Sequence, residues 1–357
     1  MTDGLRPRSV RSIAQLKDAG VVDDAEAAEL AEVASKYAVS ITPSMLERIE
    51  SSDPEQAVRR QFVPTDQELT ITPEELADPI SDEPFTPVPG VVHRYPDRVL
   101  LKPLLACPVY CRFCFRRETV GQGVGALPED DLVRAFEYIE SQSDVWEVIL
   151  SGGDPLILSA RRLRRIFDRL ESIDHVRVIR IHSRVPVVDP ERISSELCEI
   201  MDREVPVWIV VHVNAAEEIG PEAEGALRRL SRSGVPLLSQ TVLLRGVNDS
   251  PEQLEALFRL LVRNRVKPYY LHHGDLAHGT SHFRTSIDEG QALMRELRGN
   301  VSGLCQLTYT LDIPGGHGKV PIGPSYAERT DAGWRIADPS GQAHDYPPES
   351  APATPAD

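Results

Sequence analysis

The chain has 357 residues, of which 41% are hydrophobic and 26% are charged, and this composition is typical of a folded protein with a sizeable core. Its formal net charge of −16 argues against the phosphate backbone of nucleic acids as the main partner. No apolar run approaches the roughly 20 residues that span a bilayer, and the N-terminal sequence MTDGLRPRSVRSIAQ lacks the apolar centre of a signal peptide. We therefore expect neither nucleic acid nor a membrane among its partners.

Residues 1–95 are expected to form an accessory region that is helical at first and extended later. Residues 23–37 are rich in Ala, Glu and Leu with apolar side chains at helical spacing, which predicts a helix. Residues 53–89 contain seven prolines with acidic residues between them, so they cannot form one long helix and are interpreted as an extended connector. The sequence does not indicate what this region does.

From about residue 99 the pattern becomes an alternation of short apolar strands and helices long enough for crossover connections. Strands are expected at residues 99–105, 145–150, 176–182, 207–213, 235–244, 267–272 and 303–312. Helices are expected between them at residues 129–141, 161–173, 190–203, 221–233, 251–264 and 287–298. This alternation predicts a parallel sheet, which is either doubly wound or closed into a barrel.

In barrels of this kind the chemistry lies in the loops that follow the carboxyl ends of the strands. Nearly all the unusual polar residues of the chain follow a predicted strand, so we expect them to converge on one rim. In strand order they are Cys107, Cys111 and Cys114; Gly152, Gly153 and Asp154; His182, Ser183 and Arg184; Asn214; Arg245, Asn248 and Asp249; Asp275; and Asp312 with Lys319.

Cys107, Cys111 and Cys114 form a C-x3-C-x2-C pattern and are three of only five cysteines in the chain. Thiolates suit iron–sulfur clusters, zinc or copper. A four-iron cube held by three thiols would leave one iron open to a ligand from outside the protein. Structural zinc is the alternative, although zinc normally takes four protein ligands with paired spacings. The odd count disfavours a disulfide framework, and Cys198 and Cys305 fit small buried hydrophobes.

The run HRYPDRVLLKPLLACPVYCRFCFRR around these cysteines resembles the radical S-adenosylmethionine (SAM) superfamily, and specifically the lysine 2,3-aminomutase family. Matches to this family extend over residues 78–326. The resemblance implies a partial six-unit α/β barrel of the radical SAM type at residues 96–326. Residues 327–357 are rich in proline, alanine and acids, so a short, loosely ordered tail is expected there. The resemblance also implies a [4Fe–4S] cluster on the three cysteines, and free thiols with an oxygen-labile cluster fit the cytoplasm.

The segment SGGDP at residues 151–155 directly follows a predicted strand. Two glycines at a strand end let the backbone approach a ligand closely, although the segment alone fits an ordinary turn. It resembles the second motif of the superfamily, whose backbone meets the methionine moiety of S-adenosyl-L-methionine. The resemblance therefore implies SAM binding by Gly152, Gly153 and Asp154, where Asp154 stands in place of the Glu of many members.

The segment LDIPGGHGKV at residues 311–320 places a lysine in a glycine-rich loop after a strand. It lacks the spacing of a phosphate-binding P-loop. A lysine held in such a turn suits a covalent bond to pyridoxal 5′-phosphate (PLP), and the alternative is a surface lysine on a flexible loop. The segment resembles the PLP-lysine segment of the family, which implies that Lys319 is the catalytic residue that carries PLP. His317 replaces a glycine of the best-known members.

Three further residues are assigned to the substrate by the resemblance. Arg116 would hold the α-carboxylate, since a guanidinium pairs bidentately with a carboxylate. Asp275 and Asp312 would hold the ε-ammonium of lysine, although each alone fits a turn or capping role. Two carboxylates that face a cation provide charge balance, and a shorter or acidic side chain would leave these carboxylates unpaired, which favours lysine over glutamate as the substrate.

The resemblance implies an isomerase that moves the α-amino group of L-lysine to the β-carbon and gives β-lysine. The reduced cluster cleaves SAM, and the resulting radical removes a β-hydrogen from lysine bound to PLP; an electron donor such as flavodoxin or ferredoxin is implied. The alternatives are the same chemistry on another amino acid, the modification of a translation factor, or a non-catalytic iron–sulfur protein.

Structural zinc is not expected. Ser250 stands where zinc-containing members have a cysteine, and no cysteine follows Lys319. The segment on which those members build an oligomer is also missing, so a homo-oligomer is left open.

Overall fold

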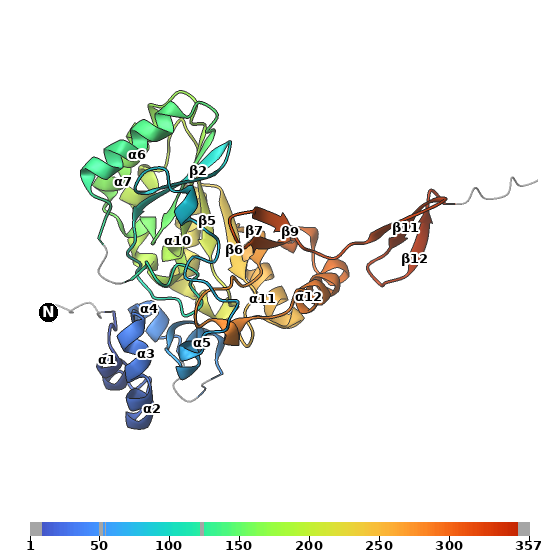
Figure 1. The fold of residues 1–357 in the computed structure, drawn as a ribbon, viewed down its shortest axis with the longest axis horizontal. Coiled ribbons are helices and arrows are strands. Elements are labelled where there is room, and N and C mark those ends of the chain that lie inside the picture. Colours follow the sequence, from blue (N-terminus) through green and yellow to red (C-terminus); the bar gives the residue numbers. More distant parts are fainter. Residues whose placement is uncertain (1–8, 50–52, 54, 122–124, 349–357) are drawn as a thin grey trace, which may run out of the picture.

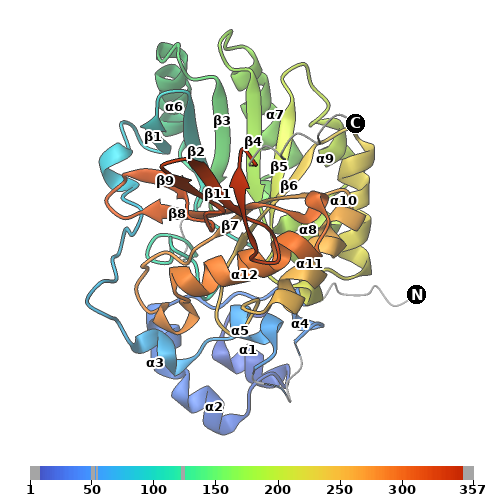
Figure 2. The ribbon, with the colours of Figure 1, turned by 90° about the vertical axis from the view of Figure 1, so that its right-hand side faces the viewer.

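The computed structural model describes residues 9–49, 53, 55–121 and 125–348. Its centre is a sheet of nine strands whose spatial order follows the chain order. Strands β2 to β8 are parallel, whereas β1 and β9 pair antiparallel at the two edges. The sheet curls into a partial barrel (Figure 1, Figure 2). The strands are β1 (Val91–Tyr95), β2 (Arg98–Leu104), β3 (Glu147–Gly152), β4 (Val178–Ser183), β5 (Val207–His212), β6 (Leu237–Val242), β7 (Lys267–His272), β8 (Thr308–Ile313) and β9 (Gly318–Pro321).

The expected six-unit partial barrel is confirmed, because six crossovers join the seven parallel strands. Five crossovers contain one long helix each, and these helices begin and end within two residues of the predicted ones. They are α6 (Glu129–Ser141), α7 (Ala160–Glu171), α10 (Pro221–Arg232), α11 (Pro251–Arg263) and α12 (Ile287–Asn300).

The crossover between β4 and β5 differs from the expected single helix at residues 190–203. It consists of α8 (Val185–Val188), the 3₁₀ turn η4 (Pro190–Arg192) and α9 (Ser195–Glu199). Proline is tolerated in a first helical turn but not in a helix interior, so Pro190 begins a new turn rather than continuing α8. Ser194 then caps α9. The predicted long helix is therefore wrong here.

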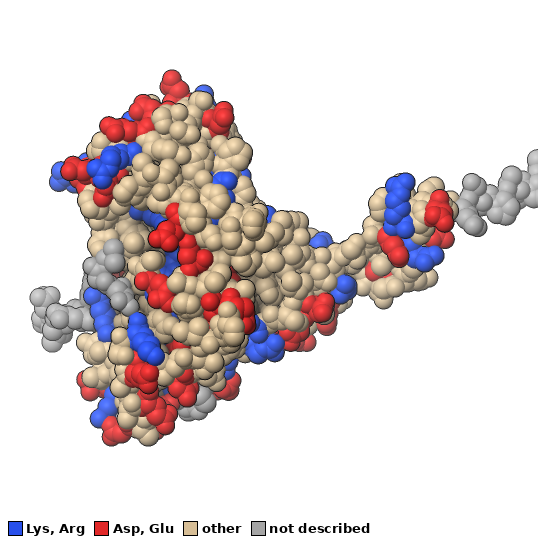
Figure 3. All heavy atoms as spheres, viewed as in Figure 1, with Lys and Arg blue, Asp and Glu red and all other residues tan. Residues whose placement is uncertain are grey.

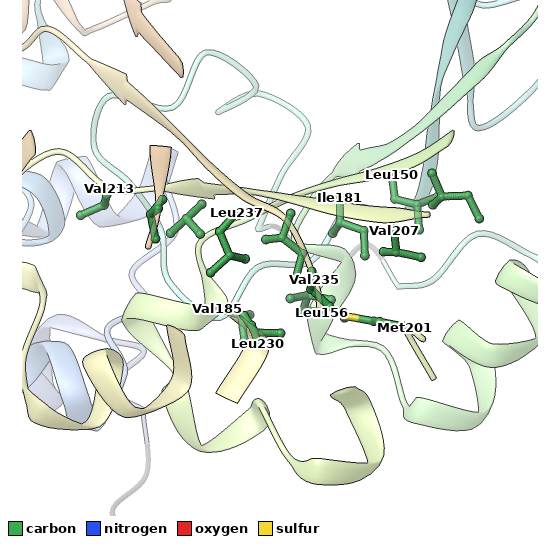
Figure 4. Packing of buried hydrophobic residues seen from close by; sticks show 14 of the residues in the cluster. Leu150, Leu156, Ile181, Val185, Met201, Val207, Val213, Leu230, Val235 and Leu237 are labelled. Atoms are coloured by element: carbon green, nitrogen blue, oxygen red, sulfur yellow. The ribbon is translucent and has the colours of Figure 1, made fainter. Parts of the chain in front are cut away.

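The main hydrophobic core lies between the convex face of the sheet and the crossover helices. Figure 4 shows Leu150, Ile181 and Leu237 of the sheet packed toward Leu230 of α10. Side chains alternate between the two faces of a strand, so the neighbours of these residues, such as Arg180 and His182, face the barrel interior. The polar residues of the strands are thereby gathered inside the barrel.

The N-terminal helices form a second, smaller core below the barrel (Figure 1). They are α1 (Ile13–Asp18), α2 (Asp24–Glu29), α3 (Ala31–Lys36), α4 (Pro43–Leu46) and α5 (Ala57–Phe62). The helix expected at residues 23–37 is interrupted at Leu30. Val109, from the loop that carries the cysteines, is buried in this core. The accessory region therefore packs directly against that loop.

The C-terminal segment is ordered where a loosely ordered tail was expected. Strands β10 (Ala327–Thr330), β11 (Gly333–Ala337) and β12 (Ala343–Tyr346) pair into a separate antiparallel sheet that projects from the barrel (Figure 1). Its backbone groups pair with one another, and this pairing is not visible in a composition rich in proline and acids. The expectation is wrong for this sheet, and residues 349–357 lie outside the described part.

Acidic and basic side chains are interspersed on the face shown in Figure 3. None of the helices formed by the described residues is long and apolar enough to cross a membrane.

Candidate active site

Cys107, Cys111 and Cys114 lie in the loop between β2 and α6, here called the cysteine loop (residues 105–121). Burial raises the pKa of the Cys114 thiol to about 11, and the neighbouring Cys111 adds to this effect. Burial also raises the pKa of Cys107, with further contributions from Asp154 and from the other two thiols. The charges of the three thiols therefore act on one another, and their assignment as cluster ligands stays a prediction. No three His, Cys, Asp or Glu side chains of the described residues are grouped as ligands of a single metal ion.

Two arginines next to the cysteines anchor this loop to the accessory region. Arg112 donates to both carboxylate oxygens of Glu68 at 2.8 and 2.6 Å, and Arg117 donates to one of them. All three side chains are fully buried. Glu68 belongs to the 3₁₀ turn η1 (Asp66–Leu69), within the proline-rich connector. This pairing gives the accessory region a role that the sequence did not indicate, because it fixes the loop that bears the cysteines.

Gly152 and Gly153 allow the end of β3 to lie against the backbone of the cysteine loop. A side chain on Gly153 would place its Cβ 2.1 Å from the carbonyl oxygen of Ala106, and Gly152 has a φ of +98°. The backbone N–H groups of Gly153 and Asp154 donate to the carbonyls of Leu104 and Ala106, each at 2.9 Å. The two glycines thus join the predicted SAM motif to the cysteines.

The carboxylate of Asp154 is buried and bonded inside the protein. It accepts from the Ser183 hydroxyl at 2.7 Å and from the backbone N–H groups of Leu156, Arg184 and Val185. Burial raises its pKa, although these hydrogen bonds oppose the shift. With its oxygens used in this way, Asp154 can offer SAM its backbone rather than its side chain, and the assignment of this motif to SAM stays a prediction.

Lys319 lies on β9 with its amine directed at two side chains of neighbouring strands. Its Nζ donates to the Asp312 carboxylate of β8 and lies 3.0 Å from Nδ1 of His272 at the end of β7. Its backbone N–H donates to the Tyr95 hydroxyl of β1 at 2.7 Å. This hydrogen bond at Lys319 therefore connects the two edge strands of the sheet, β9 and β1. His272 had not been singled out from the sequence, where it appears only as part of a strand.

Asp312 and Asp275 have opposite electrostatic environments. Burial would raise the pKa of Asp312, but a hydrogen bond with His272 and the charge of Lys319 hold it well below its usual value. Burial and the nearby Asp312 raise the pKa of Asp275 to about 7. Within the described residues, no hydrogen bond to the Asp275 carboxylate is present. The pair thus binds one ammonium, that of Lys319, and leaves one carboxylate unpaired.

Arg116 is held by an acid of the connector. Its Nε and Nη2 donate to one Asp82 oxygen at 3.0 and 2.8 Å, while Nη1 has no partner among the described residues. Lys102 lies on the inner face of β2, where the charges of Arg116 and Asp82 act on it. Burial and the charge of Arg116 lower the pKa of Lys102, and its ammonium makes no hydrogen bond within the described chain. A lysine inside a buried strand was the sequence signal for this second cation.

The barrel interior between these groups is polar. Arg180 of β4 pairs with Glu147 of β3 at 2.9 Å. His182 and His212 are half-buried, and their Nε2 atoms are buried without a hydrogen-bond partner. Burial lowers the pKa of both, so they are neutral at pH 7. Buried polar atoms are normally paired, so this interior fits a polar molecule that is not part of the chain.

Four residues expected on the rim serve the fold instead. Asn214 and Asn248 bond to backbone groups of the β5 and β6 loops, and Asp249 accepts from Gly246 N–H. Arg245 is exposed and pairs with Glu289. Cys198 and Cys305 are buried singly, as expected.

Comparisons with known proteins agree with this arrangement. The model of the radical SAM superfamily matches residues 101–261. The L-lysine 2,3-aminomutase of Fusobacterium nucleatum is 43% identical over 288 residues, which cover 81% of this chain and 68% of that protein. The L-lysine 2,3-aminomutase of Clostridium subterminale is 41% identical over 317 residues, which cover 89% and 76%. The chain belongs to the lysine 2,3-aminomutase family.

The family also includes proteins named for another substrate. The glutamate 2,3-aminomutase of Clostridioides difficile is 35% identical to this chain over 295 residues, which cover 83% of this chain and 70% of that protein. Membership in the radical SAM superfamily implies a [4Fe–4S] cluster and SAM. The three thiols of the cysteine loop are of the ligand type that such a cluster takes.

Proposed function

We propose that the protein is a radical SAM, PLP-dependent isomerase that converts L-lysine into β-lysine. The observation that carries this proposal is the pair of carboxylates at the ends of β7 and β8. Asp312 already binds a primary ammonium, that of Lys319. The negative charge of Asp312 also makes ionisation of the nearby Asp275 less favourable, which raises the pKa of Asp275. A pair of this kind favours a substrate whose side chain ends in an ammonium group.

The residues of the chain would hold three groups. Cys107, Cys111 and Cys114 would ligate the cluster, the backbone at Gly152 and Gly153 would face SAM, and Lys319 would bind PLP. When bound, the cluster and SAM supply the radical that removes a hydrogen atom, and PLP supplies the carrier for the migrating nitrogen. The polar interior with its unpaired His182 and His212 nitrogen atoms supports the placement of PLP inside the barrel.

Arg116 and the aspartate pair would orient the substrate from its two ends. Arg116 keeps Nη1 free while Asp82 fixes the other edge of its guanidinium, so one face remains for a carboxylate. Asp275 and Asp312 would accept the ε-ammonium at the opposite end. If the Lys319 amine binds PLP, it would no longer pair with Asp312, and the Asp312 carboxylate would be available to the substrate ammonium.

The same pair disfavours glutamate. A carboxylate side chain would meet Asp275 and Asp312, and like charges brought together in a partly buried site raise the free energy of binding. Among the described residues, Lys319 is the only cation that is hydrogen-bonded to this pair of aspartates. Lysine is therefore the proposed substrate within this family.

We propose a one-electron donor such as flavodoxin or ferredoxin as the partner that reduces the cluster. In the described chain, the remaining cysteines are buried singly in α9 and in the 3₁₀ turn η7 (Gly303–Cys305), so they form no second cluster. Free thiols and an oxygen-labile centre support a reducing compartment, the cytoplasm.

An anaerobic assay tests the proposal. The protein, loaded with iron, sulfide and PLP, receives SAM, dithionite and either L-lysine or L-glutamate, and the products are identified by mass spectrometry. We expect β-lysine from L-lysine and no β-glutamate. β-Glutamate as the main product would overturn the substrate, and intact SAM in a protein with a full cluster would overturn the enzyme class.

A further inference from the structure

One charged side chain reaches a thiol of the cysteine loop from the segment that follows β4. Arg184 follows β4 and is 5% exposed. Its Nη1 lies 2.7 Å from Sγ of Cys111. In the described residues it is the only charged side chain that is hydrogen-bonded to a cysteine sulfur; Cys114 is approached by the backbone N–H of Arg116.

The guanidinium of Arg184 is fixed in this position by a buried network. Its Nη2 donates to Glu218 at 2.5 Å and to Gln61 of α5 at 2.7 Å. Glu218, in the 3₁₀ turn η5 (Ala216–Glu218), also accepts from the backbone N–H of Asn214 and from the Gln61 amide. The group is therefore held by three separate parts of the chain, and its direction toward Cys111 is determined by the fold.

Aromatic rings and the SAM motif complete this support. The guanidinium carbon lies 4.7 Å from the ring centre of Phe62 and 5.4 Å from that of Phe113. The backbone N–H of Arg184 donates to Asp154 at 2.7 Å. One short segment thus connects the predicted SAM motif with a cysteine.

A hydrogen bond and a positive charge at a ligating thiolate have a defined effect on an iron–sulfur cluster. Reduction adds a negative charge to the cluster, so a nearby cation stabilises the reduced form and raises the reduction potential. Arginine keeps its charge at any working pH. Glu218 opposes the effect, because its carboxylate lies on the far side of the same guanidinium and is fully buried.

We propose that Arg184 is a positioning residue that orients Cys111 and raises the reduction potential of the cluster, and that Glu218 limits this rise. The inference rests on the cluster assigned under the proposed function and is independent of the amino-acid substrate. Its failure would therefore leave the aminomutase assignment intact.

The test is the midpoint potential of the reconstituted cluster, followed by electron paramagnetic resonance in a redox titration without SAM. We expect a more negative potential for the double variant Arg184→Gln/Glu218→Gln, which removes both buried charges together. We expect a more positive potential for Glu218→Gln, where the cation is no longer balanced. Shifts in opposite directions distinguish tuning from general damage to the site.

Arg59 provides a matched control. It is also 5% exposed and pairs with an acid, Glu26, but it lies in the N-terminal helices and contacts no cysteine. Arg59→Gln is expected to leave the potential unchanged. Equal potentials in all variants with full iron content would overturn the proposal. If the double variant fails to load iron, the test rests on the single variant Glu218→Gln. An unchanged midpoint potential in Glu218→Gln would then overturn the proposal.

Discussion

The cysteine loop and the mouth of the barrel hold charged side chains in opposite ways. In the loop, Arg112 and Arg117 are fully buried and both pair with the carboxylate of Glu68. At the mouth, Lys102 makes no hydrogen bond and Asp275 keeps an unpaired carboxylate, within the part of the chain that the structure describes. The group of Arg112, Arg117 and Glu68 is thus paired within the protein, whereas Lys102 and Asp275 carry charges that a substrate can neutralise.

The largest effect on activity is expected for Lys319, which belongs to the mouth of the barrel and has no contact with the cysteine loop among its hydrogen bonds. Lys319→Ala removes the amine that would bind PLP but none of the contacts of the cysteine loop. We expect β-lysine formation to fall to background and the visible absorbance of bound PLP to disappear, with iron content unchanged. Absorbance spectra and iron assays of the same sample measure both. A retained PLP absorbance would take Lys319 out of this role, and a loss of iron would show that the two regions are not separate.

The next effect concerns stability. Glu68→Ala leaves two buried guanidinium groups without their acid, and breaking a buried ion pair in this way costs about 3–5 kcal/mol of unfolding free energy. Urea denaturation measures the loss. The control is Glu255→Ala, which removes an exposed pair with Arg259 on α11 and should cost at most ~0.5 kcal/mol. Similar losses in both variants would contradict the difference between a paired interior and an exposed surface.

A pH-dependent effect is expected at Asp275. Its pKa is raised to about 7 in the folded chain, and it is about 3.9 in an unfolded chain. The folded state therefore binds the proton more tightly, and stability falls as pH rises between these values. Asp275→Asn removes this ionisation, so the variant should be more stable than the original protein near pH 8, with the difference shrinking toward pH 4. Denaturation at the two pH values measures it.

Whereas stability falls as pH rises, activity toward L-lysine should increase with pH. An ionised Asp275 attracts the substrate ammonium, so kcat/KM for L-lysine should rise through about pH 7. In Asp275→Asn the rise should vanish, and kcat/KM should be about 10–100-fold lower near pH 8, since hydrogen bonds to charged groups contribute about 1.5–3 kcal/mol. SAM binding should be unaffected. An unchanged pH profile in the variant would remove Asp275 from substrate binding.

The smallest effect is expected for Lys102. Lys102→Met removes one of two cations at the carboxylate end while Arg116 remains, so we expect KM for L-lysine to rise about 3–10-fold, the size of a screened charge interaction. Lys267→Met is the control, because the Lys267 ammonium bonds to the carbonyls of Leu304 and Gln306 away from the site. A KM unchanged in both variants would restrict the carboxylate end to Arg116.

The parallel barrel was predictable because its signals are local, and the candidate site residues, which stay predictions, were likewise drawn from local signals. Apolar runs of strand length alternate with amphipathic helices, and the cysteines, the glycine pair and Lys319 occur in short motifs. The β4–β5 crossover was not predicted correctly, because Pro190 divides it into short turns. The C-terminal sheet was missed because its stability comes from strand pairing and not from composition.

The partners of the charged residues were not predictable, because they come from distant parts of the chain. Arg112 meets Glu68 across 44 positions, and Arg184 meets Cys111 across 73. Only the folded chain brings these groups together. The sequence could therefore indicate candidate ligands for the cluster, but not which residues hold these candidates in place.

The position of β9 in the sheet has a further consequence. This strand pairs with β8 and follows the last parallel strand, and a single hydrogen bond from its Lys319 N–H reaches the first strand at Tyr95. The half of the sheet that bears the cysteines and the predicted SAM motif is built from β2 to β4 and has none of its ladder contacts with β9. The sheet is thus modular: the strand that carries Lys319, the proposed PLP residue, is added at one edge, and the strands next to the cysteines do not depend on it for their pairing.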